Sequence, residues 1–461
     1  MLFNSAVFLF LFLPITYGVF WALSTKNARY IWLTVTGYVF YGYWNPYFCL
    51  LMLFSTLVSY TAGLAFLRWK TPRQRRLILT LPVVVDLTLL GWFKYADFAI
   101  GSWNWVTAWG GRPPLAPLDI LLPVGISFYT FHTITYIVDA YRGHITPTRN
   151  FWEFSCYVSL FSQLVAGPIV RFRELQADLE GIDHANRRQF LDLGWSFFII
   201  GMVQKVLVAD TIASVIDPAF ENVSALSTAG AWLSMLGYSY QLYFDFAGYS
   251  NMAVGLGFLF GMHIPKNFDS PYKALNPSDF WRRWHISLSR VLRDYLYIPL
   301  GGSRGGGSAV YLNLMITMLL GGLWHGASWT FVVWGGYHGL LLCIYRRFGS
   351  HWDRLPERLQ RAGTFLLVVV GWTFFRAVTW TEATELLGTM FAPVAGVLPI
   401  GTAVLCAMLL LAGGIAHLAP NSFQLSHRWS PAAAVGLVGL LVLALVRIYG
   451  ADSSPFLYFQ F

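Results

Sequence analysis

The sequence centres on the stretch GGLWHGASW, which runs from Gly321 to Trp329 inside an apolar segment of residues 311–345. A titratable imidazole such as that of His325 is costly at hydrocarbon depth, so it usually faces a cavity or a partner and marks a function. The neighbouring glycines let the backbone bend or pack closely. Trp324 and Trp329 are expected to supply rigid apolar walls. A helix-packing histidine bonded to a neighbouring carbonyl is the alternative, and this stretch alone does not decide between the two.

The composition predicts a polytopic membrane protein. The chain has 461 residues, of which 56% are hydrophobic and only 11% are charged, whereas soluble domains carry roughly 25% charged residues. Spans of about 20 residues with short loops predict an all-α fold of about 10–12 transmembrane helices, with re-entrant or interfacial helices where apolar segments are too short or too long. Without an internal repeat or a separate soluble region, we expect one integral membrane domain over residues 1–461.

The basic residues indicate the orientation of the chain. The net charge is +9, but the lysines and arginines lie in short clusters between apolar segments. The clusters at residues 26–29 and 68–76 are separated by two expected spans and should share the cytoplasmic side, which places the N-terminus outside. We expect residues 5–23 to be a retained first span and not a signal peptide. This charge pattern does not indicate a nucleic-acid partner.

The cysteines predict neither a metal site nor a disulfide framework. They are scattered through apolar stretches, without CxxC spacing or a histidine at ligand spacing. The four positions are Cys49, Cys156, Cys343 and Cys406.

The most polar block of the chain runs from Asn276 to Tyr295, NPSDFWRRWHISLSRVLRDY. Its first residues are typical of a helix start, with Asn276 or Ser278 as cap and Pro277 in the first position. Apolar residues recur at helical spacing, so we expect an amphipathic basic helix with His285 in its middle. Its arginines either lie in the headgroup layer or bind a phosphorylated ligand, and both interpretations stay open. The candidate ligand-binding residues here are Trp281, Arg282, Arg283, Trp284 and Ser287.

Two further polar positions are candidates for the site. Arg304 lies in a glycine-rich connector, residues 297–307, and a turn at the membrane surface is the favoured explanation of that connector. Asp245 lies inside the apolar segment of residues 228–260. It could orient a histidine, pair with an arginine, or cap a break in a helix.

These motifs resemble those of the membrane-bound O-acyltransferase family, in its bacterial polysaccharide branch. The resemblance rests on FWRRWHISLS at residues 280–289, RDYLYI at 293–298 and GLWHG at 322–326, and it extends over nearly the whole chain. It implies a ring of spans around a thin centre, with a funnel from each face. It also implies that His325 is the catalytic histidine and that His285 is the second motif position, so that residues 275–345 carry both motifs.

The resemblance implies acetyl transfer across the inner membrane of a bacterium. The donor would be a cytoplasmic thioester, acetyl-CoA, with no tightly bound cofactor and no metal. The acceptor would be a hydroxyl of an extracytoplasmic polysaccharide, first alginate and alternatively cellulose or peptidoglycan, and a periplasmic acetyltransferase is an expected partner. His325 would act as general base or form an acetyl-imidazole. His285 or a tryptophan N–H, such as that of Trp324, would stabilise the oxyanion or steer the thioester, while Arg282, Arg283 or Arg304 would bind the donor phosphates.

Two other protein classes compete with this interpretation. A polysaccharide transporter or export channel would also be polytopic with buried polar residues, but such proteins tend to show paired halves, and the sequence shows no such symmetry. A scaffold for a secretion complex would leave the two histidine motifs without a reason.

Overall fold

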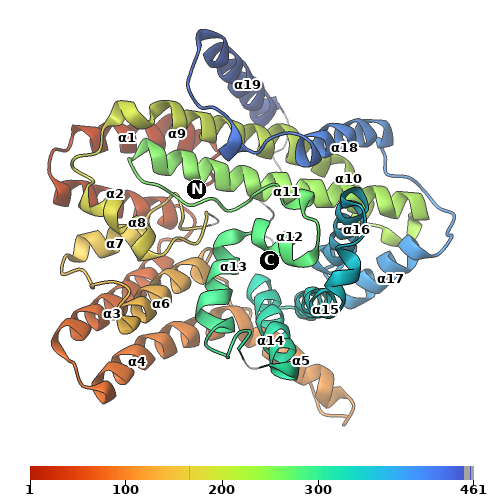
Figure 1. Cartoon of the computed structure of the whole chain (residues 1–461), viewed down its shortest axis with the longest axis horizontal. Helices are drawn as coiled ribbons and strands as arrows, with labels where there is room; N and C mark the ends of the chain where they lie inside the picture. The colour runs from red at the N-terminus through yellow and green to blue at the C-terminus, as the bar shows by residue number, and fades with distance from the viewer. Residues whose placement is uncertain (166, 305, 451–456, 458–461) are drawn as a thin grey trace. The chain divides into compact units, whose positions relative to one another are not determined.

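The computed structural model describes residues 1–165, 167–304, 306–450 and 457. Over these residues the chain forms nineteen α-helices, and its β-structure amounts to one isolated bridge between Leu226 and Val397 (Figure 1). The predicted all-α fold is confirmed. The chain divides into two compact units, residues 1–195 with 253–265 and residues 196–252 with 266–461. One domain over residues 1–461 stays a prediction.

The first unit contains the N-terminal helices. They are α1 (Leu13–Ala22), α2 (Lys26–Gly42), α3 (Phe48–Arg68), α4 (Pro72–Leu90), α5 (Ala96–Ala108), α6 (Ile126–Arg142), α7 (Phe151–Ser159) and α8 (Phe172–Glu180). Short π-helical turns precede α1 at Phe8–Phe12 and join α4 to α5 at Gly91–Tyr95.

The second unit contains the helices that carry the candidate site. They are α10 (Asp210–Phe220), α12 (Pro277–Arg283), α13 (Ile286–Leu292), α14 (Gly307–His325), α15 (Trp329–Trp352), α16 (Glu357–Arg376), α17 (Trp380–Phe391), α18 (Thr402–His417) and α19 (Pro431–Gly450). Two long helices, α9 (Arg187–Met202) and α11 (Thr228–Leu259), have residues in both units.

Several helices are suited to cross a membrane. Five helical stretches of the described chain are long and apolar enough by length and composition: Phe48–Arg68, Pro72–Ala108, Arg187–Phe220, Gly307–His325 and Pro431–Gly450. Two shorter stretches, Phe8–Ala22 and Thr402–His417, are also apolar. The chain is therefore a multi-pass membrane protein, and a total of about 10–12 spans stays a prediction.

In the first unit, a buried carboxyl group joins three helices. Asp86 of α4 accepts hydrogen bonds from Ser55 of α3 at 2.6 Å and from Thr133 of α6 at 2.7 Å. All three side chains are buried. Hydrogen bonds between helices replace the hydrophobic driving force that is missing between apolar helices in lipid, so this contact stabilises the packing of α3, α4 and α6.

In the second unit, α14 and α15 form a close hairpin in which the two helices lie side by side (Figure 1). Glycines allow the contact: a Cβ on Gly322 would lie 2.2 Å from the carbonyl oxygen of Phe331, and one on Gly335 would lie 2.2 Å from that of Met318. Small residues at a membrane helix interface let the backbones approach in this way. The close contact between the two helices fixes the position and direction of the C-terminal end of α14.

Both of the longest apolar segments were expected to contain a break, and only one of them does. Residues 311–345 are broken as expected, because Gly326–Ser328 separate α14 from α15. In the segment of residues 228–260, the chain forms one continuous helix, α11 (Thr228–Leu259), of 32 residues. The expected break in that segment is wrong, because the helix continues through Asp245 and the carboxyl group is satisfied by a side chain from another helix.

Candidate functional site

His325 is the last residue of α14, at the closed end of the hairpin. The following residue, Gly326, is extended, and Ser328 starts the next helix by accepting a hydrogen bond from the backbone N–H of Thr330 at 3.3 Å. A Cβ on Gly326 would lie 2.2 Å from the ring of Phe331. The glycine therefore lets the chain turn beside the imidazole while an aromatic ring covers the turn.

Aromatic rings surround the imidazole of His325, which is only 5% exposed. Ring centroids lie 5.0 Å away for Trp324, 5.0 Å for Trp334 and 5.3 Å for Phe375. Trp324 thus lies where the sequence predicted a wall. Trp329 is 56% exposed, and the sequence did not point to Trp334, five residues further along α15, as a wall of the enclosure.

His285 lies in a break between two short helices. Backbone angles of φ 43° and ψ 54° place it in the left-handed region, directly between α12 and α13. The predicted position in the middle of one helix is therefore wrong. Histidine is among the residues that enter this region more often than most, and such strain tends to occur at functional sites. The imidazole is fully buried, and burial lowers its pKa to about 3, so it is neutral at neutral pH.

The two imidazoles come together. The ring centroids of His285 and His325 lie 6.2 Å apart, and the ring of Trp324 lies 6.0 Å from that of His285. The two residues belong to separate motifs, 40 positions apart in the sequence, and to the same unit of the structure. The arrangement gives two basic nitrogen heterocycles in one aromatic, water-poor enclosure.

Asn267 is the residue that the sequence did not reveal. Its side-chain oxygen lies 3.1 Å from Nδ1 of His285 and accepts hydrogen bonds from Ser287, from the backbone N–H at 3.2 Å and from the hydroxyl at 2.8 Å. Its backbone oxygen accepts from the N–H of Ile286 at 2.8 Å. These bonds replace the intrahelical ones that a continuous helix would give the first N–H groups of α13, which explains the break at His285.

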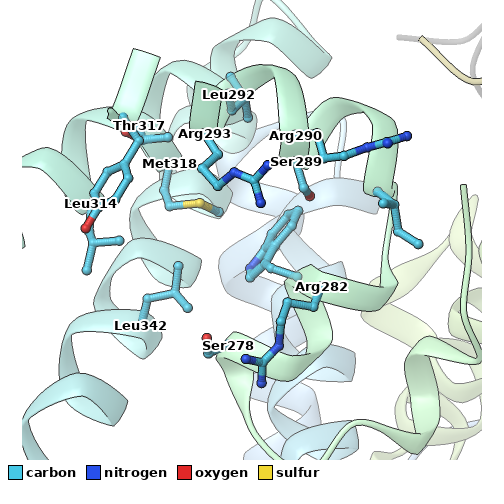
Figure 2. A pocket seen from close by; sticks show the side chains of 13 residues that line it. Ser278, Arg282, Ser289, Arg290, Leu292, Arg293, Leu314, Thr317, Met318 and Leu342 are labelled. Atoms are coloured by element: carbon cyan, nitrogen blue, oxygen red, sulfur yellow. The ribbon is translucent and has the colours of Figure 1, made fainter. Parts of the chain in front are cut away.

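A cavity of about 370 Å³ lies beside this break, in the size range of small-molecule sites. Figure 2 shows Ser289 and Arg293 on one side of the cavity, with Ser278 and Arg282 on the other. Trp281 also lines it, and its ring lies 5.7 Å from that of Trp334, which in turn contacts His325. The remaining lining residues are Ile286, Arg290, Leu292, Tyr297, Leu314, Thr317, Met318 and Leu342.

The lining of the cavity combines basic and apolar side chains. Arg282 and Arg293 have side chains that are 67% and 58% exposed, each near one aspartate: Arg282 lies 3.7 Å from Asp279, and Arg293 lies 2.7 Å from Asp294. Arg290 adds a third guanidinium from α13. An anion with an apolar extension would match both kinds of side chain, because guanidinium groups bind phosphate oxygens in a bidentate manner.

The other basic and aromatic candidates lie elsewhere. Arg283 bonds to Asp279 at 3.0 Å and to the carbonyl of Asp269 at 3.2 Å, and it does not line the cavity. Arg304 is exposed and does not line it either. Trp284 is buried, with its ring 4.9 Å from that of Trp372. These residues support the surroundings of the site or lie outside it.

Asp245 belongs to a buried ion cluster. Its Oδ1 lies 2.7 Å from Nζ of Lys205, and the same Nζ lies 2.6 Å from Asp210. The other oxygen of Asp245 accepts a hydrogen bond from the backbone N–H of Leu457 at 3.1 Å. The predicted partner, a histidine or an arginine, and the predicted helix cap are both wrong. Lys205 follows α9 in a π-helical turn, Val203–Ala209, which turns its side chain toward α11.

Comparison with known proteins adds an independent finding. Residues 119–379 match the model of the membrane-bound O-acyltransferase family. The chain is 42% identical over 498 aligned residues to a probable alginate O-acetylase AlgI of Pseudomonas putida, covering 100% of both chains. It is 37% identical over 425 residues to a peptidoglycan O-acetyltransferase of Helicobacter pylori, covering 85% of this chain and 80% of the relative. A teichoic acid D-alanyltransferase of Bacillus subtilis is 28% identical over 57% of this chain and 69% of the relative.

Proposed function

The chain belongs to the membrane-bound O-acyltransferase family, and from this premise we propose that it acetylates a polysaccharide outside the cytoplasm. It is a multi-pass membrane enzyme that transfers acyl groups. The acetyl donor is a cytoplasmic thioester, acetyl-CoA, and the acceptor is a polysaccharide hydroxyl. The membrane is the inner membrane of a bacterium, and the N-terminus faces the periplasm.

One observation carries the proposal: the buried pair of imidazoles, His285 and His325, lies in the same unit as an arginine-lined cavity. A neutral imidazole has a reference pKa of about 6.5, which suits general-base catalysis near neutral pH. The aromatic enclosure of Trp324, Trp334 and Phe375 keeps bulk water from the imidazole of His325, and low polarity strengthens every interaction with developing charge.

The reaction balances with His325 as the base. Its imidazole takes the proton of the acceptor hydroxyl while the oxygen attacks the carbonyl carbon of the acetyl thioester. The carbon–sulfur bond breaks as the tetrahedral intermediate collapses, and the leaving thiolate receives the proton from the imidazolium. The products are the acetyl ester and the free thiol, and His325 returns to its neutral state.

The cavity supports a phosphorylated donor. Arg282, Arg290 and Arg293 would bind phosphate oxygens of coenzyme A, while Leu314 and Met318 of the same cavity would contact its apolar arm. Trp281 lies between this cavity and the aromatic group of His325, so the thioester end of the donor would approach the imidazole past this ring.

The relatives support a cell-surface polymer as the acceptor. A relative aligned over 100% of this chain is named for alginate, and another, aligned over 85% of it, is named for peptidoglycan. We propose alginate, with cellulose and peptidoglycan as alternatives to be tested, and a periplasmic acetyltransferase as the partner that receives or passes on the acetyl group.

Proteoliposomes with the full-length protein test the proposal. Labelled acetyl-CoA is supplied on the cytoplasmic face, and alginate or peptidoglycan fragments on the other, with and without periplasmic extract. His325→Ala should lower release of coenzyme A by about 10²–10⁴-fold, while His184→Ala, at a histidine whose side chain is 85% exposed, serves as the control. Equal rates in wild type and His325→Ala would contradict the proposal. Label on peptidoglycan alone would contradict alginate as the acceptor and leave acetyl transfer standing.

A further inference from the structure

The side chain of Asn267 has only one orientation that satisfies its neighbours. It is 1% exposed, and it lies between Ser287 on one side and Ser250 on the other. The backbone N–H of Ser287 can only donate, so the atom that faces it at 3.2 Å must be the amide oxygen. The reversed amide would direct its NH₂ group at that N–H. The NH₂ group instead donates to the hydroxyl of Ser250 at 3.2 Å.

This orientation fixes the proton on His285. The oxygen that faces Ser287 is also the atom 3.1 Å from Nδ1 of the imidazole. An unprotonated Nδ1 would place two lone pairs against each other in a buried site, so Nδ1 carries the hydrogen and donates it to Asn267. A neutral imidazole carries a single N–H, and its second nitrogen then bears a lone pair. Burial, which lowers the pKa of His285 to about 3, keeps the ring in this neutral form.

We propose that Asn267 is a positioning residue that holds His285 in the Nδ1–H tautomer, so that Nε2 offers a lone pair to the site of acyl transfer. The inference rests on the proposed function and refines the role of His285. A lone pair cannot donate to an oxyanion, so His285 accepts a hydrogen bond and does not stabilise the tetrahedral intermediate. The acceptor hydroxyl is the substrate group that such an acceptor would orient. A hydrogen-bond partner on one ring nitrogen that fixes the tautomer of a histidine is common in catalytic and metal sites.

The first test determines the tautomer of His285 in the wild-type protein. The full-length chain, labelled with ¹⁵N-histidine and reconstituted in nanodiscs, is compared with His285→Asn, so that the difference between the two spectra gives the signals of His285. We expect one protonated and one unprotonated nitrogen at neutral pH, with the proton on Nδ1. A proton on Nε2 would overturn the proposal. This readout needs no turnover, so it remains informative if acetyl transfer itself is not observed.

Variants at residue 267 then connect the tautomer with the rate. Asn267→Leu removes the acceptor of the Nδ1 proton and should lower the rate of coenzyme A release by at least about tenfold, because a hydroxyl that His285 no longer orients loses part of the general-base contribution of His325, which is about 10²–10⁴-fold. Asn267→Asp keeps an oxygen toward Nδ1 and Ser287, while the hydroxyl of Ser250 can rotate to donate, so it should keep the tautomer and restore most of the rate. Ser250→Ala is the matched control, because it removes only the contact on the far side of the amide.

The outcomes are separable. A wild-type rate and an unchanged Nδ1–H signal in Asn267→Leu would overturn the positioning role. Loss of the rate in Asn267→Asp despite an unchanged tautomer would also overturn it, since the amide would then act in another way. If Asn267→Leu does not fold, the wild-type spectrum and the Asn267→Asp comparison decide the question. If no variant and no wild-type protein transfers acetyl groups, the proposed function fails while the tautomer assignment is still tested.

Discussion

The two histidines of the site are held by different means. His325 ends a helix whose course is set by shape, because α14 and α15 meet backbone to backbone at Gly322 and Gly335 and aromatic rings enclose the imidazole. His285 occupies a left-handed position between short helices, and hydrogen bonds to Asn267 hold it there. Packing fixes where an atom lies, whereas a hydrogen bond also fixes which atom carries a proton. The first arrangement suits a residue that exchanges a proton, and the second suits one whose protonation state should not change.

We expect the largest loss of stability from a substitution of Lys205, whose ammonium group holds two buried carboxylates together. Lys205→Met would leave Asp210 and Asp245 buried without their common cation, which should cost about 3–5 kcal/mol of unfolding free energy. Chemical unfolding in mixed micelles measures it. Lys266→Met is the control, because the partly exposed pair of Lys266 and Asp269, 3.0 Å apart, is worth about 0–1 kcal/mol. Equal losses in the two variants would show that the buried cluster does not stabilise the unit.

The next effect tests whether shape holds His325. Gly335→Ala would place its Cβ 2.2 Å from the carbonyl oxygen of Met318 and force the hairpin apart, at the upper end of about 1–3 kcal/mol. Gly336→Ala meets only the end of the Leu319 side chain, at 3.4 Å, and should be neutral or slightly stabilising, since alanine favours helix by about 1 kcal/mol over glycine. The same unfolding assay and the transfer rate check both variants. A tolerated alanine at residue 335 would mean that the backbone contact does not position the imidazole.

The smallest expected effect is on the pH dependence of stability, which tests whether burial keeps His285 neutral. Its pKa of about 3 in the folded protein lies below its ordinary value of 6.5, so the unfolded chain binds more protons between these limits. Stability therefore falls as the pH falls below about 6.5, by about 2 kcal/mol at pH 5 for this group alone. Unfolding of wild type and His285→Asn, measured at pH 7 and pH 5, should show a smaller pH dependence in the variant, because asparagine tolerates the left-handed backbone and does not titrate. The same pH dependence in both proteins would mean that His285 does not resist protonation.

The sequence predicted the features that depend on residues close to one another in the chain. The composition indicated a helical membrane protein, and Gly326 allowed a bend beside His325. Both features could be predicted because glycines and apolar runs determine the conformation of the residues next to them. The break at His285 could not be predicted, since the apolar residues around it keep helical spacing while Asn267, 18 positions upstream, binds the N–H groups that would continue the helix. The partner of Asp245 was missed for the same reason: Lys205 lies 40 residues away and reaches it only in the folded unit.

The hairpin of α14 and α15 also bears on how the protein enters the membrane during synthesis. α14 is among the stretches apolar enough to insert by itself, whereas α15 is not among them. Only three residues, 326–328, join the two helices. The insertion machinery therefore receives an apolar helix followed at once by a less apolar one that packs against it, and we expect the pair to partition into lipid together. The depth of His325 in the bilayer would then be set at biogenesis, before α16 to α19 have been made.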